Sequence, residues 1–205
     1  MSTIDKIVTE SKDFKAFARS YAQYMSKLLA QLDLNAIEDI ANELEDARRN
    51  KKTVFVIGNG GSASTASHMV NDLGFGVRQH IEPSLKVVSL TDNCAVLTAI
   101  ANDVGYEQVF LRQLQLYSHP GDKLIVISAS GNSPNLIVAA RWVKEQGGKV
   151  LGFLGFEGGQ LKGICHSSVV VSTPKGEYGP VEDVHMILDH LLYTWLWWKI
   201  RKTDG

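Results

Sequence analysis

Two apolar runs of the chain each end in a loop rich in glycine or serine, and a helical segment follows each loop. After residues 54–57 and 124–127 the loops read Gly58-Asn59-Gly60-Gly61-Ser62 and Ser128-Ala129-Ser130-Gly131-Asn132-Ser133. A helix N-terminus offers unpaired N–H groups and a positive dipole end, which suit a phosphate. Glycine lets a ligand approach the backbone, and serine hydroxyls add donors. The pair of loops therefore predicts one polar ligand held between two helix N-termini.

Strand-like and helical segments alternate after residue 52. Strands are predicted at 53–57, 86–90, 123–128, 149–155 and 167–171. Helices are predicted at 62–73, 94–115, 133–147 and 181–201. This alternation predicts an α/β fold, a three-layer sandwich with a mostly parallel five-stranded sheet. Both loops would then lie at the carboxyl ends of strands, where open α/β sheets bind ligands.

Residues 9–50 have apolar side chains at helical spacing and predict a pair of N-terminal helices, the second beginning near Asn35. We expect residues 1–205 to form a single domain, with 51–205 as the ligand-binding core. Residues 1–50 carry too many apolar side chains to stand alone, so we expect them to pack against a second copy in a homo-oligomer. Alternatively, they cover one edge of the sheet.

The composition excludes several classes of protein. A net charge of -1 gives no electrostatic argument for a nucleic-acid partner. No apolar run approaches the ~20 residues that cross a membrane, and the first residues lack the apolar core of a signal peptide. Cys94 and Cys165 lie far apart, without metal-ligand spacing, and are expected to be reduced. We therefore expect a cytoplasmic protein with neither a nucleic-acid nor a membrane partner.

The first loop, taken alone, has more than one interpretation. With Ala63 it fits the G-x-G-x-x-A dinucleotide fingerprint. The acidic residue of that fingerprint is expected about 20 residues on, but the predicted second strand ends only near Thr91-Asp92. The loop also lacks the lysine of a Walker motif. A tight turn that needs glycine for steric reasons explains it as well as a ligand site does.

The second loop is more specific. Ser133-Pro134 reads as an N-cap followed by proline at the first helical position. Capping explains Ser133 but not Ser128, Ser130 and Gly131 together. A phosphate cradle without lysine or arginine favours a sugar phosphate over a nucleoside triphosphate.

Two pairs of polar residues are spaced to share helix faces. His68 and Asp72 stand four residues apart on the helix that follows the first loop, and Glu182 and His190 stand eight apart on the last helix. If the two faces meet, these side chains suit a divalent metal such as zinc, or acid–base chemistry. Side chains of these types on helices are also commonly just solvated. Asn102-Asp103 ends an apolar helical run and either terminates that helix or reaches a sugar hydroxyl.

Together these motifs resemble the sugar isomerase (SIS) domain family, and within it the phosphoheptose isomerases. The resemblance covers nearly the whole chain and implies a flavodoxin-like fold. It implies that Asp72 is the base and His190 the acid–base partner. The implied ligands of one divalent metal, commonly zinc, are His68, Asp72, Glu182 and His190. The implied substrate contacts are Asn59, Gly60, Gly61, Asn102, Asp103, Ser128, Ala129, Ser130, Ser133 and Glu182.

The resemblance also implies a reaction and an assembly. The reaction is an aldose–ketose isomerisation of sedoheptulose 7-phosphate to D-glycero-D-manno-heptose 7-phosphate through an enediol, a step in lipopolysaccharide heptose biosynthesis. The assembly is a homotetramer with its sites at subunit contacts.

Three positions depart from the family pattern. The family's catalytic glutamate is Asp72, whose carboxylate is retracted by about 1.5 Å, and a misplacement of that order can cost about 100-fold in rate. The family's glutamine is Glu182, which adds a negative charge at the metal. A basic residue that follows the glutamate in the family is replaced by Gly76, with Arg78 nearby.

Two other functions remain open at this point. Some SIS proteins that associate with the bacterial replication initiator are non-catalytic, and they share a stretch like Thr91-Asp92-Asn93 through Asp103. Because His68, Asp72 and His190 are all present, an isomerase ranks first. A nicotinamide-dependent oxidoreductase depends on the G-x-G-x-x-A match alone.

Overall fold

A parallel sheet forms the centre of the molecule. The computed structural model describes residues 2–76 and 83–203. Within them the strands are β1 (Thr53–Gly58), β2 (Lys86–Ser89), β3 (Lys123–Ser128), β4 (Lys149–Gly155) and β5 (Ser167–Val171). Their order is β2-β1-β3-β4-β5, and every neighbouring pair is parallel. The predicted α/β class and the five predicted strands are confirmed, and the strand order is that of flavodoxin-like folds.

Helices cover both faces of the sheet. The helices that follow β1 are α4 (Gly61–Met69), α5 (Cys94–Asp103), α6 (Leu111–Tyr117), α7 (Pro134–Glu145), α8 (Gly159–Ile164) and α9 (Tyr178–Thr203). Alternate strand residues point to opposite faces, so Val54 and Val56 join one buried cluster while Phe55 and Ile57 join the other. The first cluster lies under α4 and α9, and the second lies under α5, α6, α7 and α8.

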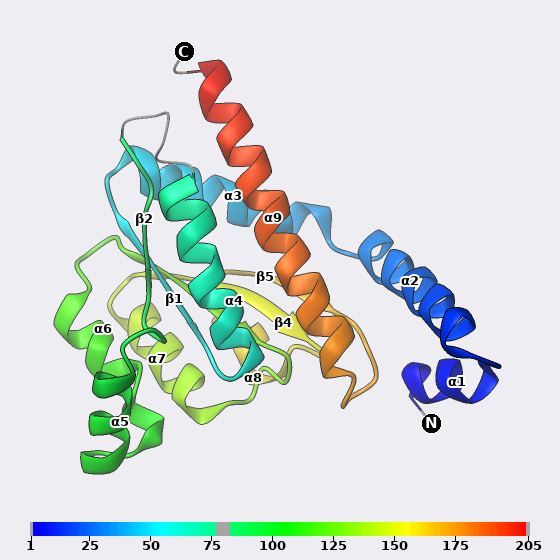
Figure 1. The fold of residues 1–205 in the computed structure, drawn as a ribbon. Coiled ribbons are helices and arrows are strands. Elements are labelled where there is room, and N and C mark those ends of the chain that lie inside the picture. Colours follow the sequence, from blue (N-terminus) through cyan, green and yellow to red (C-terminus); the bar gives the residue numbers. More distant parts are fainter. Residues whose placement is uncertain (1, 77–82, 204–205) are drawn as a thin grey trace.

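The N-terminal segment forms three helices where the sequence predicted two. They are α1 (Thr3–Glu10), α2 (Phe14–Ala30) and α3 (Leu34–Arg49). The additional break is local, because the Asp13 side chain accepts a hydrogen bond from the Ala16 N–H and begins a new helix. Helix α3 and the end of α2, through Leu28, pack into the first buried cluster, whereas α1 and the start of α2 extend to one side of the sheet (Figure 1).

Two further differences from the predicted elements have identifiable causes. The helix predicted at 94–115 is interrupted at Gly105, whose φ of +118° is incompatible with a helix, so α5 and α6 are separate. A short 3-10 turn, Tyr106–Gln108, lies between them. The short helix α8 was not predicted, because six residues are too few to show helical periodicity. No helix of the described ranges is both long and apolar enough to cross a membrane.

Helices α4 and α9 bring distant parts of the chain together. They run side by side in the same direction on one face of the sheet (Figure 1). Helix α4 begins directly after β1 and continues into a π-helix, η1 (Val70–Gly76). Such π-helical turns occur frequently at functional sites. The chain therefore places residues 61–76 against the first half of α9.

Candidate active site

The loops that follow β1 and β3 meet at the carboxyl edge of the sheet. These two strands are neighbours, and their helices α4 and α7 pack on opposite faces, which is the topological switch point where open α/β sheets bind ligands. Asn59 in the first loop and Asn135 in the first turn of α7, which follows the second loop, are joined by two reciprocal amide hydrogen bonds of 3.0 and 2.9 Å. The Tyr106 hydroxyl also donates to the Asn59 side chain, at 2.9 Å. The two loops are thus held together as one structure.

The second loop, residues 128–133, is called the serine loop below. Its shape depends on hydrogen bonds within its own backbone and on contacts with α8. The Ser128 hydroxyl is buried and accepts the Gly131 N–H at 3.0 Å. Gly131 has a φ of +63°, and a Cβ there would lie 2.0 Å from the Gly158 carbonyl oxygen, so only glycine fits. The Leu161 N–H donates to the Gly131 carbonyl at 3.0 Å. Ala129 is also buried.

The other two serines of this loop have more accessible side chains. Ser133 is the N-cap residue of α7 and is followed by Pro134, but its hydroxyl makes no capping hydrogen bond to the described residues. The Ser130 hydroxyl accepts the Asn132 N–H at a long 3.3 Å. Both residues are half-buried. Capping therefore does not account for the Ser133 hydroxyl, which is available to a ligand at the α7 N-terminus.

His68, Asp72 and His190 converge between α4, η1 and α9. The Nε2 atoms of the two histidines lie 3.0 Å apart. Asp72 Oδ2 lies 3.4 Å from His68 Nε2 and 3.6 Å from His190 Nε2. The other oxygen, Asp72 Oδ1, accepts a hydrogen bond from Asn71 at 2.8 Å. Two imidazole nitrogens and one carboxylate oxygen therefore face a common point, and this donor set fits a divalent metal.

Asp189 is a fourth member of this cluster and was missed by the sequence analysis. One potential ligand atom from each of His68, Asp72, Asp189 and His190 lies within 4.8 Å of all the others. The Asp189 side chain is completely buried, and neither oxygen has a hydrogen-bond partner in the described residues. Burial, and to a smaller extent the nearby Asp72 carboxylate, raise the pKa of Asp189 to about 7. The available signal was an acidic residue within the apolar stripe of α9.

The Glu182 side chain lies outside this cluster, near the start of α4. Among the described residues the four-residue cluster does not include it. Its carboxylate lies against Gly61, where an added Cβ would be only 2.4 Å from Oε2. Glu182 precedes His190 by eight residues, which corresponds to a rise of about 12 Å along the helix. The two side chains thus lie at different heights along α4, Glu182 at its first residue and His190 at its last turn.

The other residues expected to contact the substrate lie in the first loop and at the end of α5. Gly60 is the N-cap residue of α4, with a φ of +56°, and Gly61 begins the helix. Asn102 and Asp103 end α5, are exposed, and hydrogen-bond to each other at 2.8 Å. The chain then turns so that Tyr106 contacts Asn59. Arg78 lies outside the described residues.

Comparison with known proteins identifies the family. Residues 16–155 match the family model of the SIS domain. The chain belongs to the SIS domain family. Phosphoheptose isomerase of Pelobacter propionicus is 33% identical to this SIS protein over 189 residues, which cover 91% of this chain and 95% of that protein.

Solved structures agree with this assignment. The phosphoheptose isomerase of Neisseria gonorrhoeae superposes with a TM-score of 0.75 at 27% identity, covering 95% of this SIS protein and 98% of that chain. The phosphoheptose isomerase of Francisella tularensis gives a TM-score of 0.76 at 25% identity, covering 96% and 98%. The match extends over nearly the full length of both solved chains, so it includes the helices that carry the cluster as well as the sheet.

Proposed function

We propose that this SIS protein is a phosphoheptose isomerase that interconverts sedoheptulose 7-phosphate and D-glycero-D-manno-heptose 7-phosphate. The observation that carries this proposal is the convergence of His68, Asp72 and His190 beside two joined ligand loops. The similarity to proteins named phosphoheptose isomerase over nearly the whole chain supports the choice of substrate.

The serine loop is proposed to bind the phosphate. The Ser130 and Ser133 hydroxyls and the N-terminus of α7 supply donors and a positive dipole end. Binding the phosphate far from the reacting carbons contributes energy that orients the sugar for reaction. Asn59, Gly60, Gly61, Asn102 and Asp103 are proposed to contact the sugar chain.

The acid–base groups move a proton between neighbouring carbons. Asp72 accepts the proton from C1 of the ketose while His190 donates a proton to the C2 oxygen, giving the enediol. Return of a proton to C2 and removal of the O1 proton give the aldose. A divalent metal such as zinc, when bound by the cluster that contains His68, Asp72 and His190, supplies Lewis-acid polarisation of the carbonyl.

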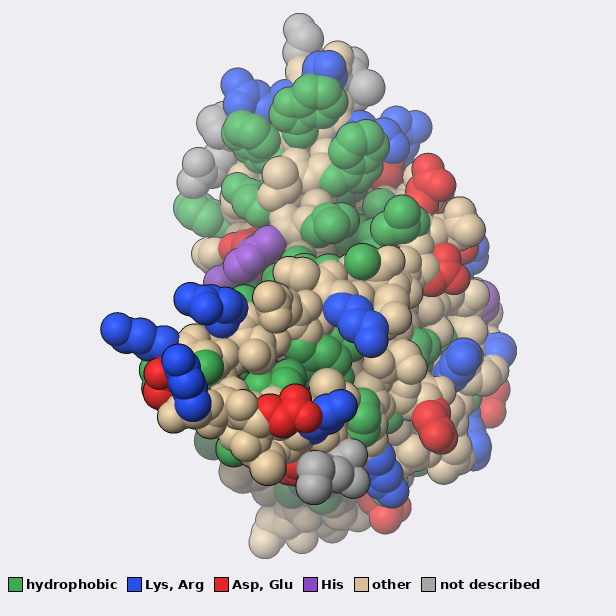
Figure 2. All heavy atoms as spheres, turned by 90° about the vertical axis from the view of Figure 1, so that its right-hand side faces the viewer, with side chains coloured by type: hydrophobic (Ala, Val, Ile, Leu, Met, Phe, Trp, Pro, Cys, Tyr) green, Lys and Arg blue, Asp and Glu red, His purple; other side chains and the backbone are tan. Residues whose placement is uncertain are grey.

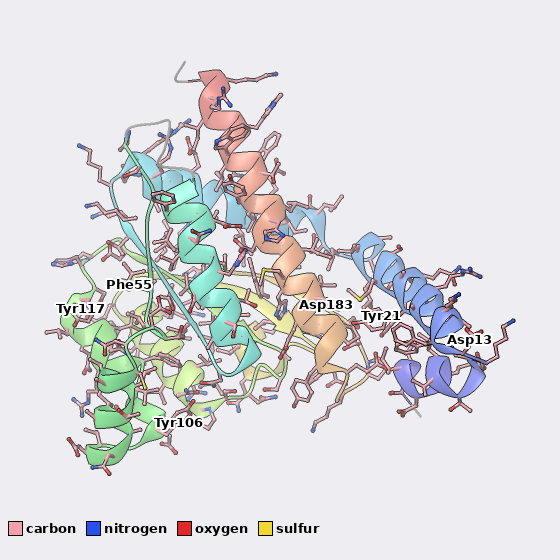
Figure 3. All side chains as sticks on the ribbon, in the orientation of Figure 1. Asp13, Tyr21, Phe55, Tyr106, Tyr117 and Asp183 are labelled. Atoms are coloured by element: carbon pink, nitrogen blue, oxygen red, sulfur yellow. The ribbon has the colours of Figure 1, made fainter. Side chains whose placement is uncertain are left out.

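The outer face of α9 supports a proposed homotetramer. Ile187, Leu191, Trp195 and Trp198 are between 37% and 50% exposed and form an apolar surface next to His190. Figure 2 shows hydrophobic side chains gathered above a histidine on this side of the molecule. Helix α2 is anchored beside the same helix, because Tyr21 donates a hydrogen bond to Asp183 near the start of α9 (Figure 3). Covering this surface with further copies would enclose the site at subunit contacts.

A turnover assay with sedoheptulose 7-phosphate and added zinc tests the function. We expect the purified chain to form the aldose, and we expect Asp72→Ala and His190→Ala each to lower kcat by about 100-fold or more. His119→Ala is the matched control, because His119 is exposed and precedes β3 at the opposite edge of the sheet. Absence of isomerisation in the wild type with metal supplied would rule out the proposal and favour a non-catalytic sugar-phosphate-binding regulator.

A further inference from the structure

Asp189 occupies a position where helix packing alone would favour an apolar residue. The buried stripe of α9 includes Val181, Val184, His185, Leu188, Asp189, Leu192, Leu196 and Ile200. Asp189 is the acidic member of this stripe and is 0% exposed. Within the described part of the chain, both of its carboxylate oxygens lack a hydrogen-bond partner. Burying such a carboxylate costs folding free energy unless another group interacts with its oxygens.

The surroundings of Asp189 indicate what offsets the cost of burying its carboxylate. Its carboxylate lies within 4.8 Å of ligand atoms from His68, Asp72 and His190. Two carboxylates this close repel each other when both are charged. A divalent cation at the common point would be contacted by both carboxylates and both Nε2 atoms together. Two histidines and two aspartates supply four donor atoms of the types that zinc binds.

The position of Glu182 favours the same conclusion. Its carboxylate lies at the first residue of α4, where a negative charge is stabilised by the helix N-terminus. To act as a ligand it would have to leave this position and extend along α9 toward His190. Asp189 is already in the cluster and comes from the residue next to His190.

We propose that Asp189 is a ligand of the divalent metal and that Glu182 is not, so that the metal is bound by His68, Asp72, Asp189 and His190. The inference rests on the proposed function, because it assigns a ligand to the metal of that site. It assigns Glu182 to the α4 N-terminus, beside the loop that contacts the sugar.

Metal binding by a matched pair of variants tests the proposal. Asp189→Asn and Glu182→Gln each remove one charge and keep the size of the side chain. We expect zinc affinity, measured by competition with a chromophoric chelator, to fall at least about tenfold in Asp189→Asn and to be unchanged in Glu182→Gln. With cobalt(II) in place of zinc, we expect the visible absorption bands to change in Asp189→Asn alone.

The opposite pattern would overturn the proposal. If Asp189→Asn keeps the wild-type affinity and cobalt spectrum, the buried carboxylate is protonated and is not a ligand. If Glu182→Gln loses the metal, Glu182 is the ligand. Failure of the wild-type chain to bind any divalent metal would overturn the proposal as well.

Two further measurements keep these outcomes interpretable. Thermal unfolding of the metal-free proteins shows whether Asp189→Asn is folded, and Asp189→Leu provides a second folded variant because it places an apolar side chain in an apolar stripe. Added zinc should raise the Tm of the wild type and of Glu182→Gln, but raise it less in both Asp189 variants. Turnover is measured separately, so a chain that binds metal through Asp189 without isomerising the sugar refutes the proposed function and leaves the ligand assignment intact.

Discussion

Two serines in one loop differ in what their hydroxyls contact, and this difference predicts opposite phenotypes. Ser128→Ala removes the acceptor of the buried Gly131 N–H. We expect it to lower the free energy of unfolding by about 1 kcal/mol. Ser133→Ala removes a hydroxyl without a capping bond to the described residues, so we expect unchanged stability and a raised KM for the sugar phosphate. Urea denaturation and steady-state kinetics of both variants check this, and equal loss of stability in the two would contradict it.

His185 is a buried histidine whose titration should make stability depend on pH. Burial lowers the pKa of His185 to about 4, against its ordinary value of 6.5, while its Nε2 contacts the Leu154 carbonyl at 3.2 Å. Below pH 6.5 the unfolded chain binds a proton that the folded chain does not, so stability falls as the pH drops from 6.5 toward 4. The loss attributable to this group amounts to about 3 kcal/mol at most.

His185→Gln keeps a donor near Nε2 but does not titrate. We expect the difference in unfolding free energy between pH 7 and pH 4.5 to be smaller in His185→Gln than in the wild type. Chemical denaturation at the two pH values measures it. Identical pH dependence in the two proteins would show that His185 is already protonated in the fold or contributes nothing.

At the scale of elements, the contact between α4 and α9 depends on a missing side chain. A Cβ at Gly61 would lie 2.4 Å from Glu182 Oε2, so Gly61→Ala must displace the Glu182 carboxylate. We expect Gly61→Ala to be destabilising and Glu182→Ala to relieve most of that cost. The coupling energy in a double-mutant cycle should fall in the range of about 0.5–3 kcal/mol. Gly61→Ala with Glu182→Gln is the control, because glutamine has the same size, and it should show no relief.

The elements that could be predicted from the sequence are those with a local signal. The strands are continuous apolar runs next to glycine or serine, and all five were located. The break at Asp13 and the interruption at Gly105 were missed, because single capping or glycine residues compete with an otherwise helical pattern. In the candidate site, the spacing of His68 and Asp72 was informative because α4 continues directly into η1, so both side chains lie on one continuous helical segment. Asp189, Asn135 and Tyr106 could not be assigned, because their partners lie 47 or more residues away in the sequence or were unknown until the helices were placed.

At the scale of the whole molecule, the exposed apolar surface of α9 makes a prediction about assembly. We expect the wild type to be a tetramer of its 22.6 kDa chain and Trp195→Glu to dissociate, because an interface would bury the new charge. Leu116→Glu is the control, since Leu116 is also exposed but lies on α6, which covers the other face of the sheet. Light scattering coupled to size exclusion gives the masses. A wild-type monomer, or an unchanged mass for Trp195→Glu, would contradict the prediction.

The pairing of α4 with α9 also determines when the site is completed during synthesis. The sheet and both ligand loops lie within the first 171 residues, whereas His190 lies 122 residues after His68. The strands and both loops are therefore synthesised before His190, the second member of the histidine pair. A chain interrupted before α9 contains both loops but cannot assemble the histidine pair.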